Sequence, residues 1–185
     1  MTHEKKSSGV RPEPGRTYEL YLMRHGIATD RDSLGASDDT NWPLTPEGKL
    51  KLRATAKGLG RLKVEWDWVI TSPLKRAVET GDVVIDELGA TVPRDTCEAL
   101  IPGDVSAHKV ISFLSQHPER CSVLLVGHEP SISQLASELV GASHSANFAF
   151  KKGGCCMIAF DGFPSKSPGL LAWWLTPRLL RKLSS

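Results

Sequence analysis

The chain has no apolar run that approaches the roughly 20 residues needed to cross a bilayer, so no membrane span is expected. Its N-terminus leads into no apolar signal-peptide core, and we therefore expect a cytoplasmic protein. The chain also lacks a large excess of charge of one sign, because it has 23 Lys and Arg residues and 21 Asp and Glu residues. The broad basic field of a nucleic-acid-binding protein is thus missing, while a local cationic pocket remains compatible with this composition.

Cysteine is scarce, with only four residues: Cys97, Cys121, Cys155 and Cys156. None of them has the CxxC spacing typical of metal or redox sites, so we expect four reduced thiols. Cys155 and Cys156 are adjacent, and in a strand they would face opposite sides of the sheet. A chain of 185 residues can bury a sufficient core without disulfides or metals, which favours one domain over residues 18–185.

Residues 1–17 are polar and rich in Pro, Gly and Ser, which predicts a disordered tail. Beyond them, short apolar runs alternate with segments of helical periodicity. The expected strands are residues 18–23, 66–71, 91–95, 122–126, 155–160 and 170–175, the last two as a hairpin. The expected helices start at Thr45 with Pro46 and at Ser72 with Pro73, and also cover residues 105–114 and 131–140. This order predicts an α/β three-layer sandwich with a mostly parallel central sheet flanked by helices.

Two of the predicted strands end at a histidine, and a third leads to an arginine near the start of a helix. Arg24 and His25 follow residues 18–23, His128 follows residues 122–126, and Arg76 follows Ser72 and Pro73. Ligands of open α/β sheets gather beyond the carboxyl ends of the strands, so these four side chains are expected at one edge. Two imidazoles and two guanidinium groups together suit an enzyme that holds and moves a phosphoryl group.

Each of the four residues has an expected role in that chemistry. His25 is the candidate nucleophile, because a neutral imidazole nitrogen is available near neutral pH. Arg24 and Arg76 would bind phosphate oxygens through planar, permanently charged groups, and His128 would donate a hydrogen bond to a non-bridging oxygen. This arrangement requires no metal or other cofactor. The remaining histidines are expected in the tail or on the surface, not in a metal cluster: His3, His108, His117 and His144.

The motifs that carry these residues resemble the histidine phosphatase superfamily, whose hallmark is Arg-His-Gly, and within it the SixA-type phosphohistidine phosphatases. The resemblance runs from about Tyr18 to Arg181 and is carried by residues 20–28, 43–45, 71–77, 125–130, 150–154 and 175–180. It implies the histidine phosphatase (phosphoglycerate mutase-like) fold. It also implies that His25 becomes the phosphohistidine intermediate, with Arg24, Arg76 and His128 completing the phosphate pocket.

Four residues bear on what this resemblance implies. Ile27 and Ala28 follow Arg-His-Gly where sugar-phosphate mutases of the superfamily usually have Glu or Gln and then Ser or Thr, which disfavours mutase activity. Trp42 stands before Pro43 where arginine is expected, which weakens the case for a phosphate contact from that loop. Glu98 is the candidate general acid from its place in the order of motifs, with an ordinary exposed carboxylate as the alternative. An imidazole leaving group can be protonated near neutral pH, so P–N cleavage depends less on such an acid.

We therefore expect a phosphatase with a covalent phosphohistidine intermediate that dephosphorylates phosphohistidine on a partner protein. A small-molecule or broad phosphomonoesterase is the enzymatic alternative, and a phosphate-dependent binding module is the non-catalytic one. The short segment between Arg76 and His128 leaves little chain for a lid, which favours an open pocket. Neither nucleic acid nor a membrane is an expected partner, and the protein is expected to be a monomer.

Two basic segments have no role in the expected chemistry. Arg178, Arg181 and Lys182 form a basic end, which is typical of a solvated face and, alternatively, of a contact with an acidic partner. Lys151 and Lys152 precede two glycines, a pattern of ordinary turns that also weakly resembles an anion-binding loop.

Overall fold

The computed structural model describes residues 17–29, 40–103, 106–142, 148–164 and 167–184. The tail expected at residues 1–17 lies outside these ranges except for Thr17, which is the first residue of strand β1. None of the described helices combines the length and the apolar character that a membrane span requires.

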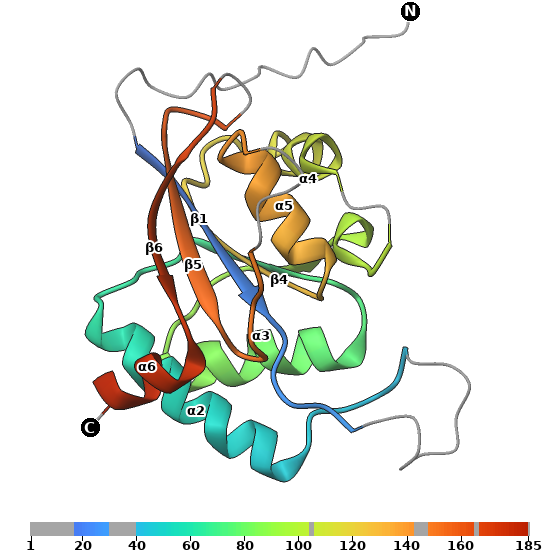
Figure 1. The fold of residues 1–185 in the computed structure, drawn as a ribbon, viewed down its shortest axis with the longest axis vertical. Helices are drawn as coiled ribbons and strands as arrows, with labels where there is room; N and C mark the ends of the chain where they lie inside the picture. Colours follow the sequence, from blue (N-terminus) through green and yellow to red (C-terminus); the bar gives the residue numbers. More distant parts are fainter. Residues whose placement is uncertain (1–16, 30–39, 104–105, 143–147, 165–166, 185) are drawn as a thin grey trace, which may run out of the picture.

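One sheet of six strands lies at the centre of the molecule, in the order β3-β2-β4-β1-β5-β6 (Figure 1). Its strands are β1 (Thr17–Arg24), β2 (Trp68–Thr71), β3 (Arg94–Thr96), β4 (Ser122–Gly127), β5 (Cys155–Asp161) and β6 (Leu170–Leu175). The first four in sequence run parallel to one another, whereas β5 pairs antiparallel with both β1 and β6. The mostly parallel sheet and the C-terminal hairpin expected from the sequence are therefore confirmed.

Helices cover both faces of this sheet (Figure 1). One face carries α2 (Pro46–Arg61), α3 (Lys75–Leu88) and α6 (Pro177–Leu183). The other face carries α4 (Ala107–Leu114), α5 (Ser131–Leu139) and a short 3₁₀ helix, η1 (Glu98–Leu100). The result is the expected three-layer sandwich, with an apolar core on each side of the sheet.

The period of two in the strands divides the apolar side chains between these cores. Leu20 and Leu22 of β1 face α4 and α5, while Tyr21 and Met23 face α2 and α3. Adjacent cysteines obey the same rule, since Cys155 lies in the α2–α3 core and Cys156 in the α4–α5 core. All four thiols are free and buried, as the sequence predicts.

The starts of the two first helices show where local signals hold and where they fail. Thr45 caps α2 as expected, because its hydroxyl accepts a hydrogen bond of 2.9 Å from the Gly48 amide. Ser72 does not cap α3, which begins later, at Lys75. The Ser72 amide instead donates to the Val126 carbonyl at 2.9 Å, so this residue still belongs to the sheet and the expected helix start is wrong.

Helix α6 is an element that the sequence analysis did not anticipate. Thr176 and Pro177 repeat the signal of Thr45 and Pro46, and the Thr176 hydroxyl accepts from the Leu179 amide at 3.4 Å. α6 packs on α2, where Gly58 lies directly against the Leu180 carbonyl. The basic end of the chain is therefore a helix, and this helix packs against α2.

Candidate active site at the carboxyl edge of the sheet

The four candidate residues surround the boundary between β1 and β4. These two strands are neighbours, but the chain leaves β1 toward α2 on one face and leaves β4 toward α5 on the other. Such a reversal opens a crevice at the carboxyl ends of the strands, where α/β proteins bind ligands. The register pairs Arg24 with Gly127, and the His25 amide donates to the Gly127 carbonyl at 3.0 Å. His25 and His128 thus follow the two strands at the same level.

The two imidazoles face each other in a nearly closed environment. Their ring centroids are 5.0 Å apart, and the side chains are only 7% and 2% exposed. Nδ1 of His25 lies 2.7 Å from the Gly26 carbonyl oxygen. A carbonyl can only accept, so this contact assigns the ring proton to Nδ1 and leaves a lone pair on Nε2 of His25.

Both histidines are held in the neutral form. Burial lowers the pKa of His25 to about 3. Electrostatic interactions with His128, Arg76 and Arg24 also lower this pKa, whereas the hydrogen bond to the Gly26 carbonyl raises it. Burial likewise lowers the pKa of His128 to about 3, assisted by Arg76 and Arg24. At neutral pH the crevice therefore contains two uncharged imidazoles beside two guanidinium groups.

The two arginines come from different layers of the fold. Arg76 is the second residue of α3 and is 6% exposed, while half-buried Arg24 ends β1. Arg24 donates from Nη1 to the Phe150 carbonyl at 2.8 Å. Burial lowers the pKa of Arg24, and the Glu129 carboxylate opposes that shift. Both side chains thus bring positive charge to the edge that the histidines occupy.

Several buried polar atoms at this edge have no hydrogen-bond partner among the described residues. Within the described residues, Nε of Arg24 and both ring nitrogens of His128 are buried without a hydrogen bond. An unsatisfied buried polar group costs about 1–3 kcal/mol. An oxyanion in the crevice would accept from such donors, so the arrangement favours binding of a phosphate-like group.

Glu129 and Thr80 support the site in ways that the sequence analysis did not assign. The Glu129 carboxylate accepts from the Phe150 amide and from the Ser133 hydroxyl at 2.6 Å, which fixes the carbonyl that holds Arg24. Thr80 accepts from the Gly26 amide at 3.0 Å. Its hydroxyl also donates to the Arg76 carbonyl at 2.6 Å, which links the residue after His25 to α3. For Glu129 a signal existed, because it directly follows His128 in the chain.

Trp42 lies over Arg76. The centre of its ring is 5.9 Å from the guanidinium carbon, within the range of a cation–π contact. The segment that carries Trp42 is tied to α3 on both sides, since Lys75 donates to the Thr40 carbonyl at 3.0 Å and Leu44 donates to the Glu79 carboxylate at 2.7 Å. The indole therefore contacts the site through Arg76.

The remaining candidates are exposed or lie outside the described residues. Glu98 starts η1, is exposed, and its side chain makes no hydrogen bond or ion pair with any other described residue. His108 and His117 are exposed, while His3 and His144 lie outside the described residues. In the described part of the chain, no three His, Cys, Asp or Glu side chains lie close enough together to hold a metal.

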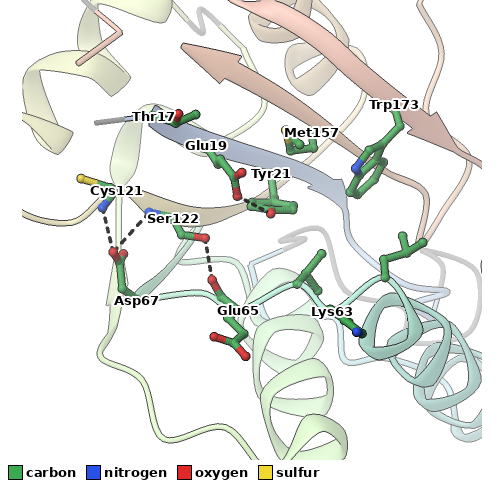
Figure 2. Close-up of a pocket in the computed structure, with 12 residues that line it drawn as sticks. Thr17, Glu19, Tyr21, Lys63, Glu65, Asp67, Cys121, Ser122, Met157 and Trp173 are labelled. Atoms are coloured by element: carbon green, nitrogen blue, oxygen red, sulfur yellow. Dashed lines mark hydrogen bonds between the residues drawn. The ribbon is translucent and has the colours of Figure 1, made fainter. Parts of the chain in front are cut away.

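A cavity of about 450 Å³ opens at the opposite end of the sheet (Figure 2). It is lined by residues at the amino ends of β1 and β4, including Glu19 and Ser122, and by Asp67. The Asp67 carboxylate accepts from the amides of Cys121 and Ser122 at 2.8 and 3.2 Å. None of the four candidate residues lines this cavity, so it is separate from the carboxyl-edge site.

Proteins with related sequences and structures include phosphatases. The sequence model of the histidine phosphatase superfamily (branch 1) matches residues 20–101. The chain is 33% identical over 122 residues to the phosphohistidine phosphatase SixA of Escherichia coli K12, covering 65% of this chain and 73% of that protein. It is 30% identical over 138 residues to an uncharacterized protein of Picosynechococcus, covering 74% and 81% of the two chains.

The solved structure of the protein histidine phosphatase SixA complexed with tungstate superposes with a TM-score of 0.74 at 28% identity, over 88% of this chain and 99% of that one. Fold and relatives together define a hydrolase of the phosphatase class. The chain belongs to the histidine phosphatase superfamily, and within it is similar to the SixA phosphohistidine phosphatases.

Proposed function

We propose that this protein removes the phosphoryl group from a phosphorylated histidine of a partner protein. The observation that carries the proposal is the pair of neutral, buried imidazoles of His25 and His128 beside the guanidinium groups of Arg24 and Arg76. The similarity to SixA, whose name gives phosphohistidine as its substrate, supports the choice of leaving group. The proposal assigns this activity to residues 18–185 as one domain, acting as a monomer in the cytoplasm.

In the first step, Nε2 of His25 attacks the phosphorus atom. A new N–P bond forms as the P–N bond of the substrate breaks, and the departing imidazole of the partner takes up a proton. Arg24, Arg76 and His128, which are buried or half-buried at this edge, stabilise the charge on the non-bridging oxygens. The Gly26 carbonyl keeps the proton on Nδ1 and holds the ring of His25 in orientation.

In the second step, a water molecule attacks the phosphorus atom of phosphorylated His25. The N–P bond breaks, inorganic phosphate leaves, and His25 returns to its neutral state. Glu98 is the proposed acid for the leaving group and the base for this water, since η1 follows β3 at the same edge of the sheet. A nitrogen leaving group limits the effect of Glu98→Gln on the first step, because imidazole is protonated without strong assistance.

Rapid-quench labelling tests the nucleophile. Mixing the protein with a ³²P-histidine-phosphorylated carrier protein is expected to trap acid-labile, base-stable label on His25. His25→Ala is expected to abolish both label and turnover, whereas the matched variant His108→Ala, at an exposed histidine of α4, retains both. Label on a serine or a cysteine would refute the assignment of His25.

A substrate comparison tests the leaving group. We expect turnover of the histidine-phosphorylated carrier to exceed that of a chromogenic phosphoester, measured as kcat/KM. Equal turnover of both would favour a broad phosphomonoesterase, and turnover of neither by the intact protein would favour a binding module.

A further inference from the structure

Two basic segments that are distant in sequence meet beside His25. The Gly153 amide donates to the carbonyls of Arg24 and His25 at 3.1 and 3.2 Å. Gly154 lies next to Pro177, the first residue of α6. The turn that carries two lysines and the helix that carries three basic residues are therefore neighbours at the carboxyl edge. We call these five side chains the basic rim: Lys151, Lys152, Arg178, Arg181 and Lys182.

The basic rim borders the site itself. Lys152 and Arg181 line one small cleft together with Gly26, the residue that follows His25. Arg178, Arg181 and Lys182 are spaced three and four residues apart on α6, so they share one side of that helix. A protein that presents a phosphoryl group to His25 is large enough to reach this surface, whereas a single phosphorylated amino acid is not.

Among the described residues, no carboxylate neutralises the charges of the basic rim. In the part of the chain that the structure describes, none of the five has a carboxylate at ion-pair distance. Some cations elsewhere are paired, as Lys49 is with Glu79 and Arg94 with Asp82, and the rim differs from other unpaired cations in bordering the site. The net charge of the whole chain is only +2, so a general excess of positive charge does not explain the cluster.

The position of Arg178 adds an independent observation. It lies in the first turn of α6, which contains no acidic residue, and its side chain is exposed. The dipole of a helix disfavours a cation at this end. Helix stability therefore does not account for Arg178, whereas an interaction with an external anionic surface does.

We propose that the basic rim is the docking surface for an acidic face of the phosphorylated partner protein. This inference rests on the proposed function, because it names the kind of protein that brings phosphohistidine to His25. Complementary charge at an interface raises the association rate about 10–1,000-fold, and salt screens it over a Debye length of about 8 Å at 0.15 M. The basic rim would thus raise the rate at which the partner protein associates and would leave the rate of P–N bond cleavage unchanged.

The test compares two substrates with the same P–N bond. One is a histidine-phosphorylated carrier protein with Asp and Glu around its phosphohistidine, and the other is free phosphohistidine. In the double variant Lys152→Glu/Arg178→Glu, kcat/KM for the carrier is expected to fall about tenfold or more and to lose its salt dependence. For free phosphohistidine, kcat/KM is expected to stay within twofold of the wild type.

A matched control carries two charge reversals away from the rim. Arg61→Glu/Lys63→Glu changes two exposed cations, one in the last turn of α2 and one just after that helix, which likewise have no carboxylate partner among the described residues. This variant is expected to act on both substrates as the wild type does. An unchanged kcat/KM for the carrier in the rim variant, or an equal loss on both substrates, would overturn the proposal.

Binding separates this inference from the proposed function. If the wild type hydrolyses neither substrate, the proposed function fails, and association with the phosphorylated carrier decides the role of the rim. Weaker association in the rim variant supports docking, and unchanged association overturns it. Binding of anionic lipid vesicles or duplex DNA through the rim, as tight as binding of the carrier, would overturn the assignment to a protein.

Discussion

Arg76 gains its orientation from an uncharged neighbour. A guanidinium group binds phosphate through a planar fork, so its usefulness depends on the direction in which the plane points. The Arg76 guanidinium carbon lies 5.9 Å from the centre of the Trp42 ring, and the hydrogen bonds of Thr40 and Leu44 to α3 fix the segment that carries Trp42. We therefore expect Trp42 to act as a positioning residue for Arg76.

Replacing Trp42 tests this contact. Trp42→Ala is expected to lower kcat/KM about fivefold, mainly through KM, because a cation–π contact is worth about 0.5–2 kcal/mol. Trp42→Phe, which keeps an aromatic face, is expected to remain within about twofold of the wild type. Tungstate affinity, measured by calorimetry, should weaken in parallel with KM in the Ala variant. A purely structural role would lower the free energy of unfolding in urea and leave tungstate affinity unchanged.

At the residue scale, the sequence predicted those site residues that directly follow a recognisable strand or helix start. Arg24, His25 and His128 directly follow apolar strands, so their common edge could be predicted from strand direction alone. Thr80 and Trp42 had no such signal, because their partners are distant in sequence. Thr80 bonds Gly26, and Trp42 contacts Arg76, through a tertiary arrangement that no local pattern encodes.

The contact between α2 and α6 depends on a glycine. Gly58 lies in the last turn of α2, where alanine would ordinarily be the better helix former. Here a Cβ atom would overlap the backbone carbonyl of Leu180. The two helices can approach each other at this point only because position 58 has no side chain.

Gly58→Ala is therefore expected to lower the free energy of unfolding by about 2–3 kcal/mol, since backbone atoms must move to relieve the overlap. Gly60→Ala is the matched control in the same helix, where the new methyl group would meet only the flexible end of the Leu88 side chain. We expect that variant to stay within about 1 kcal/mol of the wild type. Urea denaturation followed by circular dichroism measures both, and equal values for the two variants would contradict this account.

At the scale of elements, local signals were correct where the chain makes no competing contact. Thr45 caps α2, and Gly89 ends α3 with a φ of 62°, as the sequence indicates. Ser72 carries the same signal as Thr45 but is used by the sheet, because its amide pairs with β4. That outcome depends on a neighbouring strand, which a local pattern does not identify.

The neutral histidine pair links the site to the stability of the whole molecule. His25 and His128 have a pKa of about 3 in the folded protein, against about 6.5 in an unfolded chain. Between these values the unfolded state binds protons that the folded state does not. The free energy of unfolding is therefore expected to fall as pH decreases from 7 to 5, by about 2 kcal/mol for each histidine.

Urea unfolding at pH 7 and pH 5 measures this dependence. The double variant His25→Gln/His128→Gln is expected to lose most of the slope, whereas His108→Gln, at an exposed position of α4, keeps it. Tungstate is expected to reduce the slope in the wild type, because a bound anion favours protonated imidazole. A slope that is the same in all variants would exclude the two histidines as its source.

The burial of all four thiols gives a second test at this scale. Burial raises the pKa of Cys97, Cys155 and Cys156, that of Cys156 to about 12, and a thiol reagent requires the thiolate. We expect no thiol of the native protein to react within minutes, and all four to react on unfolding in guanidinium chloride. Labelling of native Cys155 or Cys156 at a rate above that of global unfolding would show that the hairpin opens locally.

Because β1 pairs with β4 in a register that sets Arg24 beside Gly127, catalytic turnover depends on the alignment of these two strands. A slip of β1 by one residue along β4 would carry His25 about 3.3 Å from its counterpart and point it to the other side of the sheet. Substitutions deep in either core that shift this register would abolish activity, although they lie far from the substrate. The secondary structure and the compactness of the protein would persist. Loss of activity without unfolding is thus the expected result of a substitution that shifts the pairing of β1 with β4.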